Sequence, residues 1–178
     1  SRAFDSPEAV FTFLEYYSSN DVVLVDSGTR VNKDGTTEVK ADIYDTKTRS
    51  HTVQYKEYLV PTGEYLPALH TWILTRIGFS EAIKTFLSIY NTRPVKNDYA
   101  LDERTPGVLF CFDSVSPYTQ RQLAKESSLP FMVHVVSHSW FTDPWLLQHL
   151  LDQQMKVNTL FAKTTVYQAS NKYESLRY

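Results

Sequence analysis

The chain has 178 residues, of which 42% are hydrophobic and 14% aromatic, and its formal net charge is −2. This composition excludes a globally disordered chain and supplies enough apolar side chains for one sizeable domain. The slightly negative charge argues against a dedicated nucleic-acid surface. A single cysteine cannot form an intrachain disulfide, which indicates a reducing compartment. No apolar run approaches the roughly 20 residues that span a bilayer, so no membrane partner is expected. Because the first residue is Ser1 and not methionine, we expect a fragment of a longer protein.

The first 50 residues carry the signals of a helix and a β-hairpin. Residues 6–18 open with a Ser-Pro pair, an N-cap followed by proline at the first helical position, and continue with recurring apolar side chains. Residues 21–25 are an apolar, β-branched run, and residues 37–44 alternate as a hairpin partner would. We interpret residues 1–50 as an N-terminal helix-plus-hairpin extension packed on a main domain at residues 51–178.

The middle of the chain predicts a strand, a helix and a second, weaker strand. Residues 53–60 are a strand candidate, and residues 64–77 place apolar side chains on one helical face before Gly78. Residues 83–90 are interpreted as a strand, although a helical turn fits part of the same segment. The charged, turn-rich residues 91–106 predict a surface loop.

A strand–helix–strand–helix pattern follows. Residues 107–112 and 131–136 are short apolar runs typical of buried parallel strands, and residues 118–126 between them contain helix formers without a breaker. Asp143-Pro144 is an N-cap with proline at the first position of another helix. This order indicates a parallel α/β unit. Cys111 lies inside the first run and is interpreted as a core residue.

The second strand ends in Val135-Val136-Ser137, with Trp140 shortly after. This arrangement resembles the second half of a BRCT domain, in which a strand ends in two apolar residues and a serine, and a tryptophan opens the last helix. The resemblance covers about residues 53–154. It implies an α/β fold with a four-stranded parallel sheet flanked by helices on both faces, and a structural role for Trp140.

The resemblance also implies a phosphate-binding site. Phosphopeptide-binding BRCT domains carry Ser or Thr followed by Gly after the first strand, and Thr-x-Lys at the start of the second helix. Thr62-Gly63 matches the first motif, and Thr119 with Arg121 approximates the second. A phosphate at a helix N-terminus meets free N–H groups and the positive end of the helix dipole. Arg121 departs from the lysine of the family, but arginine also binds phosphate.

On this resemblance we expect an interaction module of a nuclear assembly whose partners are a phosphorylated protein or peptide and other chromosomal proteins. The chain is similar to BRCT domains of kinetoplastid kinetochore proteins, which implies chromosome segregation, with microtubule binding elsewhere in the parent protein. The alternatives are a phosphate-independent BRCT scaffold in DNA repair and a DNA-binding module. The net charge disfavours nucleic acid as a partner. The basic residues that could contact DNA are Lys84, Arg93, Lys96, Arg104, Arg121 and Lys125.

Two enzymatic readings find little support in the sequence. Asp26 with Glu38 and Lys40 resembles the acidic constellation of metal-dependent nucleases, but a solvated hairpin of mixed charge is the favoured interpretation. Cys111 could pair with a histidine such as His134, yet its place in an apolar run favours the core. No His or Cys pair has metal-ligand spacing, and no phosphate-binding glycine loop occurs. We therefore predict no catalytic residues, no metal and no cofactor, and a protein that is not an enzyme.

Overall fold

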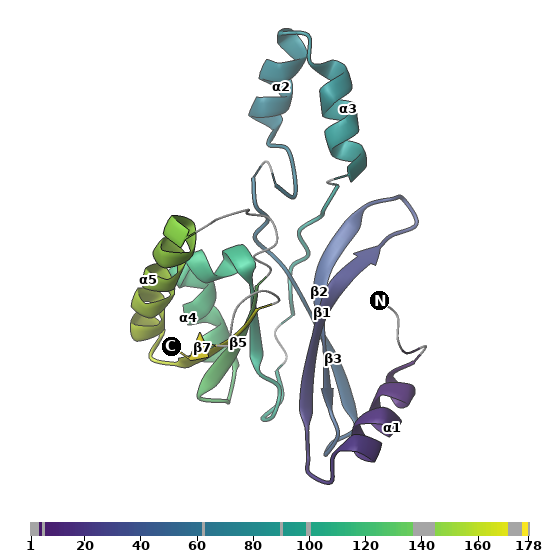
Figure 1. Cartoon of the computed structure of the whole chain (residues 1–178), viewed down its shortest axis with the longest axis vertical. Helices are drawn as coiled ribbons and strands as arrows, with labels where there is room; N and C mark the ends of the chain where they lie inside the picture. Colours follow the sequence, from purple (N-terminus) through teal and green to yellow (C-terminus); the bar gives the residue numbers. More distant parts are fainter. Residues whose placement is uncertain are drawn as a thin grey trace.

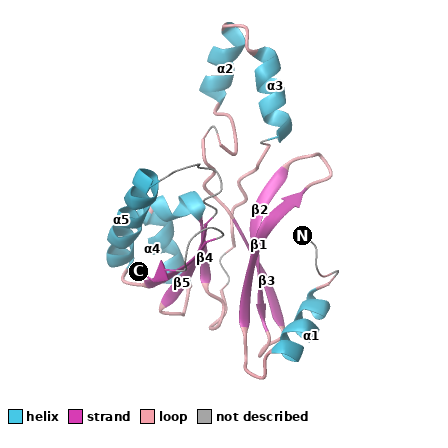
Figure 2. Ribbon diagram, viewed as in Figure 1, coloured by secondary structure: helices cyan, strands magenta, loops and turns pink. Residues whose placement is uncertain are grey.

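The computed structural model describes residues 4, 6–61, 63–89, 91–98, 101–136, 145–170 and 176–177. Figure 1 shows two sheets side by side, with helices on the outer side of each. The first sheet is antiparallel with the order β1-β2-β3, and the second has the order β4-β5-β6-β7. Figure 2 shows the same arrangement by secondary structure.

The first sheet contains β1 (Val23–Val31), β2 (Thr37–Asp45) and β3 (Ser50–Tyr55). The predicted hairpin is confirmed, because β1 and β2 pair antiparallel along their whole length. The predicted N-terminal helix is α1 (Pro7–Tyr17), and it is capped by the Ser6 side chain. Residues on both sides of position 50 share this sheet, since β3 pairs with β2.

The second sheet contains three parallel strands and a short antiparallel one. They are β4 (Gly107–Phe110), β5 (Phe131–Val136), β6 (Thr165–Ser170) and the two-residue β7 (Leu176–Arg177). The predicted helix between the first two strands is α4 (Pro117–Glu126), and α5 (Trp145–Ala162) precedes β6. The predicted parallel unit is confirmed.

Two clusters of buried side chains explain why the sheets stack. One lies between the second sheet and its helices, where Leu123 of α4 and Met155 of α5 meet Met132. The other lies between the two sheets, where Ala41 and Ile43 of β2 pack on side chains of β4. The apolar strands of the second sheet are therefore covered by helices on one face and by the first sheet on the other.

This architecture contradicts the predicted four-stranded parallel sheet with helices on both faces. Residues 53–60 were expected to begin that sheet, but β3 belongs to the antiparallel sheet. The strand predicted at residues 83–90 is also wrong, because residues 80–89 form the helix α3 (Ser80–Ile89). The β-branched and aromatic residues of this short segment favour a strand, but a run of so few residues fits a helix as well, and periodicity does not separate the two.

The helices α2 (Ala68–Arg76) and α3 form a hairpin that stands away from both sheets (Figure 1). Gly78 joins them with φ +89°, a conformation that favours glycine. Among the described residues of the hairpin, α2 has none that is buried. No helix in the described part of the chain is long and apolar enough to cross a bilayer. The exposed apolar side chains of the hairpin are Leu69, Trp72, Ile73, Ile77, Phe79 and Leu87.

Candidate functional site at the Cys111 turn

Cys111 lies at a sharp turn and not inside a strand. β4 ends at Phe110, and the chain continues directly into the 3-10 helix η1 (Cys111–Val115). The backbone of Cys111 has φ +30°, in a region that residues other than glycine rarely adopt. Its side chain is partly exposed and lines a cavity, so the prediction of a core cysteine is wrong. Such strained conformations persist only where the surroundings hold them.

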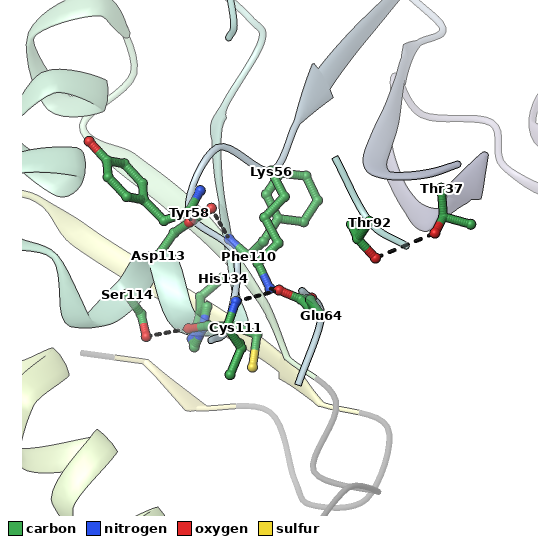
Figure 3. Close-up of polar contacts among 11 residues, drawn as sticks. Thr37, Lys56, Tyr58, Glu64, Thr92, Phe110, Cys111, Asp113, Ser114 and His134 are labelled. Carbon is green, nitrogen blue, oxygen red and sulfur yellow. Dashed lines mark hydrogen bonds and ion pairs between the residues drawn. The ribbon is translucent and has the colours of Figure 1, made fainter. Parts of the chain in front are cut away.

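Side chains from two elements hold the backbone of this turn (Figure 3). The Cys111 carbonyl oxygen accepts the Ser114 hydroxyl at 2.6 Å. The His134 Nε2 atom, on the neighbouring strand β5, lies 3.3 Å from the same oxygen. The other ring nitrogen of His134 lies 2.8 Å from Oε1 of Gln168 on β6. Both His134 and Gln168 are buried, so these contacts fix the turn to the sheet beneath it.

A buried ion pair lies beside this turn. Lys56 directly follows β3 and is only 2% exposed, and its Nζ donates to both carboxylate oxygens of Glu64 at 2.6 and 2.7 Å. One of those oxygens also accepts the Val60 N–H at 2.7 Å, so Glu64 closes the loop that it belongs to. Figure 3 shows the pair near Cys111. A lysine is almost never this buried without such a partner.

Lys56, Glu64 and Cys111 line one cavity of about 610 Å³. It lies at the carboxyl ends of β4 and β5, where parallel sheets commonly place their ligand sites. The cavity therefore brings together a thiol, an ammonium and two carboxylates, those of Glu64 and Asp26. The rest of its wall has the apolar side chains Val25, Val39, Val60, Phe110, Val135, Val136 and Ala169 and the hydroxyl residues Ser27, Thr29 and Ser170.

Asp113 lies two residues after the cysteine and is 3% exposed. Burial raises the pKa of its carboxyl group from 3.8 to about 7, although nearby Lys56 and two backbone N–H groups act in the opposite direction. These N–H groups belong to Tyr58, at 3.2 Å, and Phe110, at 3.4 Å. Asp113 is therefore a titratable group next to the cavity.

The residues predicted to bind phosphate lie on two different elements. Gly63 lies in the loop beside Glu64, while Thr119 is buried in the first turn of α4 and Arg121 lies on the same helix. Among the residues described, no hydrogen bond or ion pair joins Gly63 to that helix. Thr62 and Trp140 fall outside the described residues. The phosphate assignment stays an untested prediction, and the fold that motivated it is absent.

Sequence reasoning missed Lys56 and Glu64 and misplaced Cys111. The available signal was a lysine next to a strand candidate, followed eight residues later by a glutamate in a Pro-Thr-Gly-Glu turn. A charge at such a place needs a partner if the segment is buried.

The fold matches solved structures of enzymes. A carbon–nitrogen hydrolase from Helicobacter pylori G27 aligns with a TM-score of 0.60 at 12% identity, over 92% of this chain and 50% of that one. A variant of the amidase from Nesterenkonia sp. AN1, with acrylamide added to its active-site cysteine, aligns with a TM-score of 0.56 at 12% identity, over 92% and 53%. Another structure of that amidase variant, with an acetamide group on the same cysteine, gives 0.53 at 15% identity, over 94% and 55%.

This chain thus spans about half the length of the structures it matches. No protein-family model and no curated protein matches the sequence. At these identities the likeness shows a common fold, that of carbon–nitrogen hydrolases.

These matches overturn the functional expectations drawn from the sequence. The chain does not have the fold of a BRCT domain, and the predicted phosphopeptide-binding, kinetochore and DNA-repair roles are contradicted with it. The prediction that the chain is not an enzyme is contradicted as well, since the matched structures are hydrolases, among them an amidase with an active-site cysteine. A strand followed by a helix-opening tryptophan is a packing pattern that several α/β folds share, which is why the resemblance misled.

Proposed function

We propose that the chain carries the catalytic cysteine of an enzyme that cleaves carbon–nitrogen bonds of amides by acyl transfer to Cys111. The observation that carries this proposal is the shared cavity, in which Cys111, in a strained backbone conformation, accompanies Lys56 and Glu64. A strained turn that lifts a nucleophile off the end of a strand is a recurring device of covalent catalysis. The amidase matches support the same chemistry.

The first half of the reaction forms a thioester. The thiol proton passes to a carboxylate of the cavity, and Glu64 is placed for this task because its side chain already lies there beside Lys56. The sulfur attacks the amide carbonyl carbon, and the Lys56 ammonium stabilises the oxyanion that develops. The carbon–nitrogen bond then breaks, and the amine leaves with the proton that the thiol had given up.

The second half releases the acyl group. A water molecule gives a proton to the same carboxylate and attacks the thioester carbon. The carbon–sulfur bond breaks, the carboxylic acid leaves, and the proton returns to the sulfur of Cys111. A different acceptor in place of water would give a new amide or ester with the same atom balance.

The wall of the cavity supports an apolar acyl group on the substrate. Seven of its side chains are apolar, and burying an apolar chain against them is favourable by about 0.8 kcal/mol per CH₂ group. We therefore expect longer acyl groups to react faster than acetyl until the cavity is filled.

Cys111 is the only cysteine of the chain, which makes the test direct. The protein is incubated with acetamide, butyramide and octanamide, and with the matching p-nitrophenyl esters. The reaction is then quenched in acid, and the mass of the intact protein is measured by mass spectrometry. We expect an adduct equal to the substrate minus its leaving group, growing with acyl length and absent in Cys111→Ala. Lys56→Met should slow its formation, whereas Lys84→Met, at an exposed ion pair, should not. Release of product at equal rates by wild type and Cys111→Ala would overturn the proposal.

A further inference from the structure

One buried carboxylate contacts both segments that build the candidate site. Oδ1 of Asp113 accepts the N–H of Tyr58 at 3.2 Å, and Oδ2 accepts the N–H of Phe110 at 3.4 Å. Figure 3 shows the Asp113 side chain beside Tyr58 and Phe110. Tyr58 follows Lys56 by two residues, and Phe110 immediately precedes Cys111.

These two segments come from different sheets. Lys56 follows β3 of the antiparallel sheet, whereas Cys111 follows β4 of the parallel sheet. The loop after Lys56 is fixed at Val60, where Glu64 accepts the backbone N–H. Asp113 fixes the same loop nearer its start, at Tyr58, and ties it to the cysteine turn.

We propose that Asp113 is a positioning residue that holds the Lys56 segment in register with the Cys111 turn. This inference rests on the function proposed above. Asp113 does not line the cavity, so it acts on Lys56 and Cys111, which do, through the backbone of Tyr58 and Phe110. Ionised, its two oxygens both accept hydrogen bonds. Protonated, one oxygen becomes a donor, and one of the two backbone contacts is weakened.

The surroundings of Asp113 make this exchange relevant near neutral pH. Burial raises its pKa to about 7, Lys56 opposes that effect, and Glu64 adds to it. His134, a titratable residue of β5, also contacts this turn, and its Nε2 lies 3.3 Å from the Cys111 carbonyl oxygen. Charged and neutral forms of Asp113 are therefore both populated at neutral pH, and the ionised form is the one that holds both segments.

The test compares Asp113→Asn with Asp102→Asn. Asp102 is a matched control because its carboxylate also accepts a backbone N–H, from Arg104, and a side-chain hydroxyl, from Thr105, away from the cavity. The readout is the rate at which iodoacetamide alkylates Cys111, measured from about pH 6 to about pH 8, which reports the environment of the thiol without any turnover.

We expect the rate of wild type divided by that of Asp113→Asn to be close to one at the acidic end, where Asp113 is neutral like asparagine. The ratio should rise by about threefold or more through pH 7, as a lost charge-assisted hydrogen bond would produce. Asp102→Asn should show a constant ratio. A constant ratio for Asp113→Asn would reduce Asp113 to a purely structural role and overturn the inference.

A second measurement covers the case in which Asp113→Asn fails to fold. Protection of the Tyr58 amide proton against exchange with solvent, corrected for the intrinsic rate, is followed in wild type across the same pH range. We expect this protection, divided by that of the buried Leu123 amide, which reports global unfolding, to increase through pH 7, and we would abandon the inference if the ratio stayed constant. Because neither readout requires catalysis, a wild type that forms no acyl adduct would refute the proposed function while these results still decided the role of Asp113.

Discussion

Lys56 and Glu64, eight positions apart in the chain, form a buried ion pair, with Nζ of Lys56 at 2.6 and 2.7 Å from the two carboxylate oxygens. The side chains are 2% and 12% exposed, so neither charge is well hydrated. Each depends on the other, since an unpaired charge at this depth is strongly unfavourable. The pair fixes the loop and also presents an ammonium to the cavity that Cys111 lines.

Removing one partner of this pair should therefore be worse than removing both. We expect Glu64→Gln to lower the free energy of unfolding by about 3–5 kcal/mol, because it leaves Lys56 buried and uncompensated. The double variant Lys56→Met/Glu64→Gln should lose less than the single variant Glu64→Gln. Urea unfolding of the two single variants and the double variant measures the coupling. Glu81→Gln, at an exposed pair, is the control and should change stability by less than about 1 kcal/mol. Additive losses would show that the two charges are independently solvated.

The backbone strain at Cys111 gives a second prediction. Alanine is normally more favourable than glycine in a folded chain, but at φ +30° the Cβ atom of alanine is strained. We expect Cys111→Gly to be at least as stable as Cys111→Ala. At Ala124, in α4, replacement by glycine should cost about 1 kcal/mol, because in a helix alanine is more stable than glycine. Thermal unfolding of the three variants measures both differences. A Cys111→Gly variant clearly less stable than Cys111→Ala would show that the turn relaxes without strain.

Local signals in the sequence predicted much of the fold. The Ser-Pro cap of α1, the alternation of β2 and the two apolar strands around α4 were read correctly, because each depends on residues close in the chain. The position of β3 was not. Its mixed sequence, Ser-His-Thr-Val-Gln-Tyr, suits either sheet, and only the partner strand decides which one it joins.

The candidate site was hidden for the same reason. Lys56 and Cys111 are 55 positions apart and come together only because the two sheets stack. An apolar stretch around Cys111 reads as continuous strand, whereas β4 ends after four residues and the turn begins at the cysteine itself. Nothing in the local pattern shows a positive φ at a residue other than glycine, because tertiary contacts such as that from His134 impose it.

His134 should matter through its contacts and not as a base. Its ring lies between Gln168 and the Cys111 carbonyl oxygen and is buried. We expect His134→Phe to destabilise the fold by about 1–3 kcal/mol, because buried polar groups on both sides lose a partner. It should also slow alkylation of Cys111. Adding Gln168→Leu should recover part of the stability but not the alkylation rate, since the Cys111 carbonyl stays without its His134 contact. Urea unfolding and iodoacetamide labelling separate the two effects, and full recovery of both would contradict this assignment.

The hairpin of α2 and α3 should tolerate polar substitution. Leu69 is 64% and Trp72 59% exposed, so replacing them removes little buried apolar area. We expect Leu69→Gln and Trp72→Gln each to change the free energy of unfolding by less than about 0.5 kcal/mol. Leu123→Ala, at a side chain 1% exposed between α4 and the sheet, should cost about 2–5 kcal/mol. Urea unfolding measures all three. A large loss from the hairpin variants would show that this surface is covered in solution.

Asp113 should make the stability of the fold depend on pH in the opposite sense to an ordinary salt-bridged carboxylate. In the unfolded chain its pKa is near 3.8, and in the fold burial raises it to about 7. Between these values the folded protein holds a proton that the unfolded chain has lost. Since the folded state binds more protons, the contribution of Asp113 to stability falls as pH rises from about 4 to about 7 and is constant above that.

The difference in unfolding free energy between wild type and Asp113→Asn isolates this group, because all other titrations cancel to first order. As pH rises from 4 to 8, the unfolding free energy of wild type should fall relative to that of Asp113→Asn. The fall should be at most about 4 kcal/mol, since one pKa unit corresponds to about 1.4 kcal/mol. Urea unfolding at several pH values measures it, and Asp102→Asn is the control. The hydrogen bond from Thr105 lowers the pKa of Asp102 by more than burial raises it, so the net pKa of Asp102 is lowered. The difference for Asp102→Asn should therefore have the opposite sign, with wild type losing stability relative to the variant as pH falls below about 4. A flat difference for Asp113→Asn would mean that Asp113 is ionised in the fold throughout this range, its two backbone contacts outweighing burial.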